Sequence, residues 1–413
     1  MKSNYKRLGE YIREVNVRNL ELKDVKLLGV SIQKVFIPSI ANTIGTNMKT
    51  YKLIKKDQFA YGPVTSRNGD KISIALLENY KEAMISQSYT CFEIINKNEL
   101  LPEYLMMWFR RPEFDRYARY MSHGSVREIF SWEEMCDVEL PIPSIQEQRK
   151  IVKEYNVLVN RNCLSNNLIG KLAETAQSIY KQWFIDFEFP DENGKPYKSN
   201  GGEMEYNKKL DMDIPKGWDV MKVGELCESN PSNLSKNDSF KTISYLDTSN
   251  ITNNEIDEIK ILNLEKDKIP SRAKRKVIHN DIVFSTVRPN LKHFGIIKNP
   301  EANLIASTGF VVLRPIHPNI CSELIYLTIT SDDTLKKLQA KAEMSVSTYP
   351  SIRPEDLLNI DFIMPPVSIL EKAESIFVPV YNLIHLIQKE KKILGLGMDI
   401  LLSRLATTKE VFK

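Results

Sequence analysis

The sequence predicts an α+β protein: two duplicated globular α+β domains separated by two long antiparallel coiled-coil helices, with pseudo-twofold symmetry. Two observations lead to this fold class. The two halves of the chain resemble each other, and each half ends in a long segment with an apolar seam. The 413 residues are enough for two domains and their connections. A repeat about half the chain long indicates duplicated domains rather than a solenoid.

The duplication is visible as short motifs that recur in the same order. Gly124-Ser125-Val126-Arg127 returns as Met344-Ser345-Val346-Ser347, a shift of 220 residues. Four further pairs follow at shifts between 211 and 222: 69–70 with 280–281, 86–92 with 306–312, 101–105 with 321–325, and 140–143 with 362–365. Five weak matches in order indicate a duplicated unit.

Each repeat is expected to contain a domain of short strands followed by a helix. In the first domain (1–143), β-branched and aromatic runs alternate with turn residues, and a helical stretch follows at 102–120. The second domain (214–365) repeats this order, with strand-like runs at 276–285 and 309–314 before a helical stretch at 323–342. Between them, the polar and turn-rich segment 188–213 is predicted to be a linker.

A long helix is predicted over 144–187, directly after the hinge Pro141-Ile142-Pro143. Its 39 residues from Gln146 to Phe184 would span roughly 58 Å. Apolar residues fall three and four positions apart, as in a coiled-coil seam, which Asn162 and Ser165 interrupt. The seam consists of Ile151, Tyr155, Leu158, Ile169, Leu172, Ile179 and Trp183.

A second long helix is predicted within 366–413. Pro379 marks either its start or a kink, and Gly395 and Gly397 weaken its centre. We expect the two helices to bury their seams against each other as an antiparallel pair; packing of each helix on its own domain is the alternative. The second seam consists of Ile376, Val380, Leu383, Ile387, Leu394 and Leu401.

Composition favours a cytoplasmic protein with a polyanionic partner. Residues 1–60 hold 12 Lys/Arg against 5 Asp/Glu, and residues 260–298 hold 10 against 3, a balance of +7 in each. Plain solvation of these segments is the alternative. The five cysteines show no ligand spacing, which is typical of a reducing compartment. No apolar run approaches membrane-spanning length, and the first residues open no apolar stretch of the kind that a leader has, so we expect neither membrane insertion nor secretion.

No catalytic or metal-binding motif is found. The sequence has no GxxxxGK phosphate loop, no GxGxxG after a strand, no GxSxG and no HExxH, and the five histidines lack metal spacing. We therefore expect no catalytic residue, metal or cofactor in this chain, which is predicted to be a binding protein.

Polar, basic loops in both halves are the candidate DNA-binding sites. Arg can fork onto guanine, Asn can pair with adenine, and Ser, Thr and Lys can hold phosphates. The candidates in the first half are Arg67, Asn68, Lys71, Ser122, His123, Ser125 and Arg127. Those in the second half are Lys274, Arg275, Lys276, Ser285, Thr286, Arg288, Asn290, Lys292, Ser345 and Ser347.

With these features, the chain resembles the specificity subunit of type I restriction–modification systems. The resemblance rests on 140–152 at the entry to the first helix, 181–187 at its end, Ile214-Pro215-Lys216-Gly217-Trp218 and 281–289. It departs from the family at the second hinge, which lacks the Glu-Gln pair, and at the two glycines of the second helix.

The resemblance implies two target recognition domains, each reading one half of a split double-stranded DNA sequence, with the helix pair fixing the spacer. It also implies two methyltransferase subunits that bring S-adenosylmethionine, and restriction/translocase subunits that use ATP and Mg. The alternative is a duplicated scaffold that joins two proteins without contacting DNA. DNA binding that weakens steeply with salt would separate the two.

Overall fold

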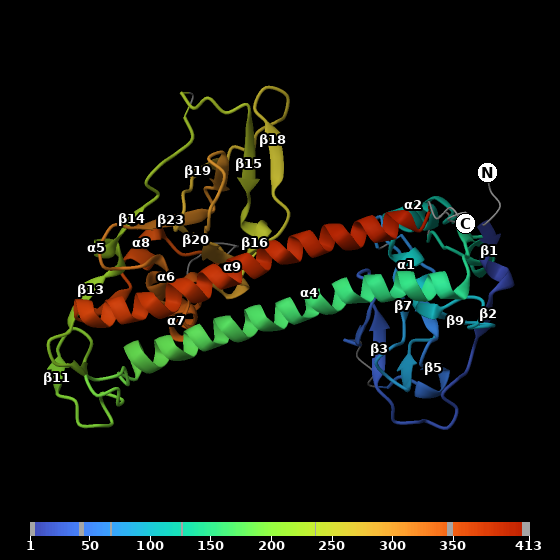
Figure 1. Cartoon of the computed structure of the whole chain (residues 1–413), viewed down its shortest axis with the longest axis horizontal. Helices are drawn as coiled ribbons and strands as arrows, with labels where there is room; N and C mark the ends of the chain where they lie inside the picture. Colours follow the sequence, from blue (N-terminus) through green and yellow to red (C-terminus); the bar gives the residue numbers. More distant parts are fainter. Residues whose placement is uncertain are drawn as a thin grey trace. The chain divides into compact units, whose positions relative to one another are not determined.

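The computed structural model describes residues 5–40, 45–66, 68–124, 127–235, 237–344 and 350–406. The chain forms two compact units: unit 1 is Met1–Leu164 with Lys391–Lys413, and unit 2 is Ser165–Glu390. Each unit contains one globular domain and a part of both long helices (Figure 1).

The globular domain of unit 1 is built on an antiparallel sheet and a mixed sheet. One has the strand order β2-β9-β6-β7 and another the order β4-β3-β8-β5, in which β3 and β8 run parallel. Phe59 and Phe92 stack at 4.8 Å between ring centroids in its core. The strands are β2 (Ile12–Val15), β3 (Leu27–Val30), β4 (Phe36–Pro38), β5 (Lys52–Lys55), β6 (Phe59–Tyr61), β7 (Ile74–Leu76), β8 (Glu82–Ile85) and β9 (Thr90–Ile94).

The domain of unit 2 repeats these two sheets strand for strand. Its sheets have the orders β14-β23-β20-β21 and β18-β15-β22-β19, and β15 and β22 run parallel as β3 and β8 do. The predicted duplication is therefore confirmed. The strands are β14 (Cys227–Ser229), β15 (Thr242–Leu246), β18 (Lys260–Asn263), β19 (Ala273–Lys276), β20 (Ile282–Ser285), β21 (Phe294–Ile296), β22 (Leu304–Ser307) and β23 (Phe310–Pro315).

Helices follow the sheets at corresponding positions. The predicted helix 102–120 is two helices, α1 (Pro102–Arg110) and α2 (Pro112–Tyr120), because Arg111 precedes a proline and is extended. The predicted helix 323–342 is likewise split into α6 (Ser322–Thr330) and α7 (Asp332–Glu343), and the Ser331 side chain caps α7 by accepting from the Thr334 N–H.

The first and last strands of each domain pair with each other. Antiparallel ribbons form between β1 (Tyr5–Arg7) and β10 (Glu139–Pro141), and between β13 (Asp219–Lys222) and β24 (Asp361–Met364). The remaining short elements are η1 (Leu8–Glu10), η2 (Met48–Thr50), α3 (Trp132–Cys136), η3 (Lys181–Ile185), α5 (Val223–Leu226), η4 (Thr248–Asn250), β16 (Ile251–Thr252), β17 (Glu255–Ile256), η5 (Pro289–Leu291) and α8 (Pro354–Leu358).

The long helices α4 (Ile145–Tyr180) and α9 (Val367–Arg404) pack side by side within each unit (Figure 1). In unit 1, Tyr155 of α4 shares a core with Leu402 of α9, and a Cβ at Gly397 would lie 3.3 Å from Leu158. Residues in the first half of α4 thus contact residues near the end of α9, so the prediction that the two helices are antiparallel is confirmed. No helix among the described residues is both long and apolar enough to cross a membrane.

Both helices also pack on the globular domains, so the two packing modes coexist. In unit 2, Tyr180 of α4 donates a hydrogen bond to Thr328 of α6 at 3.2 Å, and Tyr381 of α9 lies edge-on to Tyr326 at 5.4 Å. The seam of α4 is buried or half-buried at the predicted positions, and Ser165 is buried as well.

The predicted seam of α9 needs correction. Leu383 is 43% exposed, whereas Ile384 is 2% exposed, so the prediction for Leu383 is wrong. The reason is that α9 must also cover the second domain with Phe377 and Tyr381, and this rotates its buried face by one residue. The helix also begins at Val367, before Pro379, rather than at the proline.

The segment predicted as a linker is folded. Residues 204–207 and 212–215 form the hairpin of β11 (Met204–Asn207) and β12 (Met212–Pro215). Phe189 stacks on Tyr197 at 4.6 Å and on Trp218 at 4.9 Å, which ties the segment to the core of unit 2. The polar composition of the segment did not reveal that it is folded, because only three aromatic side chains provide the packing.

Gln148, in the motif at the entry to the first helix, anchors α4 to its domain. The side chain is fully buried. Its Oε1 accepts from the Leu101 N–H at 2.9 Å, and its Nε2 donates to the carbonyls of Glu99 (2.8 Å) and Pro143 (2.9 Å). In the second half, the residue 222 positions later is Leu370, which is buried in an apolar cluster. The second hinge therefore lacks the Gln because it is anchored by apolar packing.

Replacing Gln148 by Leu should destabilise unit 1 by about 2–4 kcal/mol, because buried backbone groups lose their partners. Chemical denaturation of the purified chain measures this. The exposed Gln146→Leu is the matched control and should unfold at the wild-type denaturant concentration. An unchanged midpoint for Gln148→Leu would show that the three hydrogen bonds do not hold the hinge.

Candidate nucleic-acid interface

In the second domain, the candidate loop after β20 lies beside the described segment that leads into α8. The loop after β20 (286–293) meets the segment before α8: the Arg288 N–H donates to the Pro350 carbonyl and the Ile352 N–H donates to the Thr286 carbonyl, both at 2.9 Å. A β-bridge between Val287 and Ser351 joins them. Residues more than 60 positions apart thus form one polar surface.

Within this surface, the backbone turns Arg288 and Lys292 outward. Both have a positive φ, 49° and 57°, and they flank the short helix η5. Left-handed backbone is unfavourable for such residues and is often found at binding sites. Both side chains are exposed, as is that of Asn290, whose backbone N–H donates to Gln339 of α7 at 3.1 Å.

Other predicted residues of this domain are engaged within the fold. Ser285 is buried and its hydroxyl bonds to Val287, while the Thr286 hydroxyl donates to the Gly309 carbonyl at 3.2 Å. On β19, Arg275 donates to Asn233 at 3.0 Å. Its neighbour Lys276 forms an ion pair with Asp238 that holds the pKa of that carboxyl below its usual value. Lys274 is exposed.

The first domain brings its two loops together in the same way. Val64, after β6, bridges to Ile129, and the Phe130 N–H donates to the Pro63 carbonyl at 2.8 Å. The side chains of Lys71, His123 and Arg127 are exposed and that of Asn68 is half-buried, whereas the buried Ser122 hydroxyl donates to the Ala118 carbonyl at 2.6 Å. His123 lies 3.3 Å from a Glu134 carboxylate oxygen. Arg67, Ser125, Ser345 and Ser347 lie outside the described residues.

The loop pairs occupy equivalent places in the repeat. One partner follows the equivalent strands β6 and β20, and the other follows the equivalent helices α2 and α7. The sequence identified the loops as counterparts but did not predict that segments beside them pair with each other. Each domain therefore presents one composite polar surface, and the exposed side chains on the two surfaces differ.

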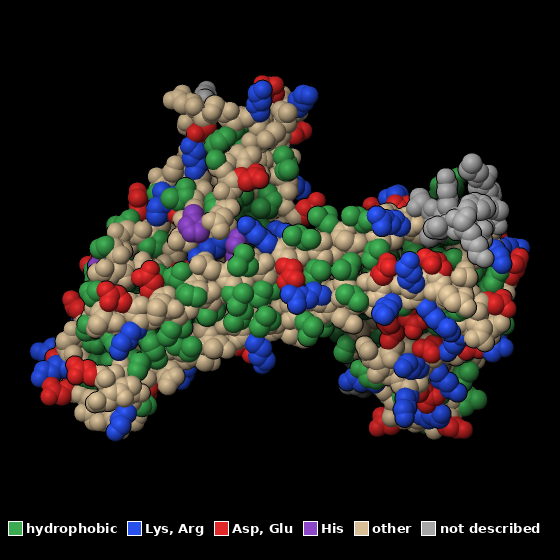
Figure 2. All heavy atoms as spheres, viewed as in Figure 1, with side chains coloured by type: hydrophobic (Ala, Val, Ile, Leu, Met, Phe, Trp, Pro, Cys, Tyr) green, Lys and Arg blue, Asp and Glu red, His purple; other side chains and the backbone are tan. Residues whose placement is uncertain are grey.

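A second kind of surface runs along the long helices. Figure 2 shows hydrophobic side chains gathered on the visible faces of α4 and α9. In unit 1, Val157 and Leu164 of α4 are exposed, and so are Ile393, Leu396 and Ile400 of α9. In unit 2, Leu168 of α4 is exposed with Leu383 and Leu386 of α9. Apolar side chains exposed in rows are typical of docking faces.

The described residues hold no group of three or more His, Cys, Asp or Glu that could bind a metal ion.

The sequence pattern of the type I restriction modification DNA specificity domain matches residues 23–174 and 215–394, which cover both domains. The chain belongs to this family. Membership confirms the resemblance that the sequence showed and makes DNA sequence specificity the function of the chain; it does not favour the adaptor alternative.

Individual relatives agree. The type I restriction enzyme MjaIX specificity subunit of Methanocaldococcus jannaschii is 26% identical over 332 residues, 76% of this chain and 70% of that protein. The HindI specificity subunit of Haemophilus influenzae is 24% identical over 169 residues, 41% of this chain and 36% of its own length. The crystal structure of a type I S subunit from M. genitalium superposes with a TM-score of 0.57 at 14% identity, covering 98% of this chain and 96% of that one, which supports the fold.

Proposed function

We propose that the chain reads a bipartite DNA target, one half-site per domain. The observation that carries this proposal is the pair of joined loops that recurs at equivalent positions, through Val64 and Ile129 in one domain and through Val287 and Ser351 in the other. Because the frame repeats and the exposed side chains do not, the domains suit two unlike half-sites. Guanidinium, amide and ammonium groups on such loops have the donors and acceptors that base edges and phosphates require.

The long helices are proposed to set the spacer between the half-sites. Each unit contains a part of both α4 and α9, so the helices are the elements that the two units share. The exposed apolar rows on these helices are proposed to dock two methyltransferase subunits. S-adenosylmethionine, ATP and Mg, together with the restriction activity, would then belong to partner subunits, and this chain would supply recognition alone.

The variant Arg288→Ala tests whether the polar surface of the second domain, here called the reading surface, contacts DNA bases. With the methyltransferase partner present, we expect affinity for the cognate site to fall by about 1–3 kcal/mol, roughly 5- to 150-fold, with relaxed preference at one base pair, because the variant cannot form a bidentate hydrogen bond to guanine. Titration against the cognate duplex and single-base variants measures both. Lys336→Ala, an exposed change on α7 of the same unit, is the control and should leave both unchanged.

Unchanged affinity and preference in Arg288→Ala would remove this residue from the reading surface. Salt dependence tests the wider proposal. A complex that binds DNA through phosphates loses affinity steeply between 50 and 200 mM salt. If the complex showed no affinity for DNA at low salt, the adaptor alternative would replace DNA recognition.

A further inference from the structure

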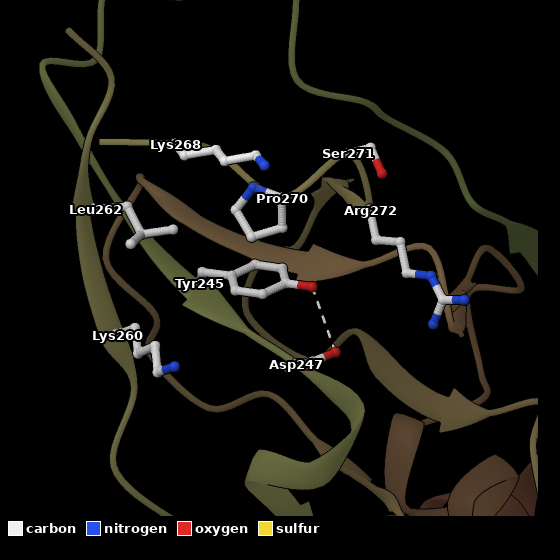
Figure 3. Close-up of a pocket in the computed structure, with 8 residues that line it drawn as sticks. All are labelled: Tyr245, Asp247, Lys260, Leu262, Lys268, Pro270, Ser271 and Arg272. Atoms are coloured by element: carbon white, nitrogen blue, oxygen red, sulfur yellow. Dashed lines mark hydrogen bonds between the residues drawn. The ribbon is translucent and has the colours of Figure 1, made fainter. Parts of the chain in front are cut away.

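A cavity of about 460 Å³ opens in the second domain beside the candidate interface (Figure 3). It lies between β15, β18 and the connection from β18 to β19, and none of the residues that line it was singled out from the sequence. Leu262 and Pro270 form its apolar wall, and the polar groups stand around them. It is lined by Tyr245, Asp247, Lys260, Leu262, Lys268, Pro270, Ser271 and Arg272.

At the floor of the cavity, two polar side chains are hydrogen-bonded to each other. The Tyr245 side chain is largely covered, with the residue 6% exposed, and its hydroxyl donates to Asp247 Oδ1 at 3.3 Å. The same oxygen accepts from the Thr248 N–H at 2.8 Å, so the carboxylate is engaged at the start of η4. Burial is the largest cause that raises the pKa of Tyr245, which therefore stays a neutral donor. A covered ring offers little face on which a base could stack.

The mouth of the cavity is cationic. Lys260 and Lys268 lie on either side of the Tyr245 ring and Arg272 lies beyond its hydroxyl (Figure 3). All three are exposed, and within the described part of the chain their side chains form no ion pair. Three positive charges against one engaged carboxylate leave the site with a surplus of two. Such a site suits a small, multiply oxygenated anion.

The cavity is connected to the loop after β20 through the turn between β22 and β23. Thr308 donates its N–H to the Arg272 carbonyl at 2.8 Å, and the next residue, Gly309, accepts from the Thr286 N–H at 3.0 Å. The rim of the cavity and the loop after β20 are thus both hydrogen-bonded to the β22–β23 turn.

Among the described residues of the first domain, the tyrosine and aspartate of this site are replaced by apolar residues. The parallel pairs Leu28–Ile85 and Tyr245–Ile305 are equivalent, because Ile85 and Ile305 differ by the repeat shift of 220. Leu28 therefore stands where Tyr245 stands, and it is buried at 2% exposure. Two positions later, Val30 replaces Asp247. The Tyr245–Asp247 pair thus belongs to the second repeat and not to the equivalent positions of the first.

We propose that this cavity binds a backbone phosphate of the DNA beside the half-site read by the second domain. The proposal rests on the proposed DNA-reading function and deepens it. The two domains then differ in their affinity for DNA as well as in their base preference, because the second domain adds a contact that does not depend on the base sequence. Lys260, Lys268 and Arg272 hold the phosphate, and Asp247 keeps the Tyr245 hydroxyl in place.

The double variant Lys260→Gln/Arg272→Gln, assembled with the methyltransferase subunits, tests the site. We expect cognate and scrambled duplexes to lose affinity by the same factor. The slope of log K against log salt should become shallower by about 0.9 for each phosphate that the variant no longer neutralises. The bases that are methylated should not change. Lys266→Gln, an exposed change just before the cavity residue Lys268 in the sequence, is the matched control and should match wild type.

Single methylphosphonate substitutions, which remove the charge of one phosphate, locate the bound phosphate. Wild type should lose affinity at one or two positions beside the second half-site, and the double variant should lose nothing further there. The proposal is overturned if the double variant keeps wild-type affinity and slope, or if its base preference changes. If the wild-type complex does not bind DNA, the proposed function fails as well; normal wild-type binding with an unaffected double variant removes the cavity alone.

Discussion

Removing one heptad from each long helix is expected to shorten the DNA spacer that the complex recognises. Deleting Asn160–Asn166 from α4 and Lys389–Gly395 from α9 removes matching lengths, since Leu158 lies opposite Gly397. Both deletions preserve the three-and-four spacing of the seams. Seven residues correspond to about 10.5 Å of helix, or roughly three base pairs. The expected result is loss of methylation at the original target and its appearance at a target with a shorter spacer.

Methylation profiling of cells that carry the altered system measures this directly. The control deletes three residues from each helix; this breaks the seam register and should lower stability instead of producing a new spacer. Because specific binding exceeds non-specific binding by about 10³–10⁷-fold, loss of the original target should be nearly complete. Methylation that continued at the original spacing would show that the helices do not set it.

The largest expected change in stability follows from the buried ion pair of unit 2. Lys298 donates to Glu323 in the first turn of α6 and to Asn280 at 2.8 Å. Glu323 is 1% exposed. Replacing Glu323 by Leu leaves a buried ammonium group without its carboxylate, so we expect a loss of about 3–5 kcal/mol in the free energy of unfolding. Urea denaturation of the purified chain measures it.

Two variants complete that experiment. Lys298→Met combined with Glu323→Leu removes both charges and should recover most of the lost stability, since a buried pair and apolar packing are often equivalent. Glu203→Gln, in the exposed pair with Lys216, should leave the midpoint unchanged. A single Glu323→Leu variant that unfolded at the wild-type urea concentration would contradict the buried-charge argument.

The architecture could be predicted from the sequence because its signals are long. The repeat shift of 220 is the distance between Pro102 at the start of α1 and Ser322 at the start of α6, and the spacing of apolar residues revealed both long helices. The prediction of local detail failed where tertiary packing, and not the heptad spacing, decides which residue is buried. Leu383 fits the heptad but is exposed, because Ile384 is the residue that covers the domain.

The candidate site could be predicted only as a set of loops. Composition and position drew attention to Arg288 and Lys71, but the β-bridges that join the loops connect residues more than 60 positions apart. Such pairings depend on the completed sheet and leave no local sequence pattern. The cationic cavity was missed for the same reason. Lys260 on β18 and Arg272 beside β19 come together only when β18 and β22 pair with β15 and β19 pairs with β22, although both lie in the segment with a charge balance of +7.

The ribbons that join the ends of each domain bear on how new specificities can arise. Tyr5 pairs with Pro141 and Asp219 with Met364, so the chain enters and leaves each domain at neighbouring points. An inserted domain with adjacent ends can be exchanged without disturbing what lies outside it. Genetic crossovers within the two strands of a ribbon would replace one reader and keep the spacer, whereas duplications within a helix would change the spacer and keep both readers. Under the proposed roles of the domains and the helices, the two components of specificity would be separately heritable.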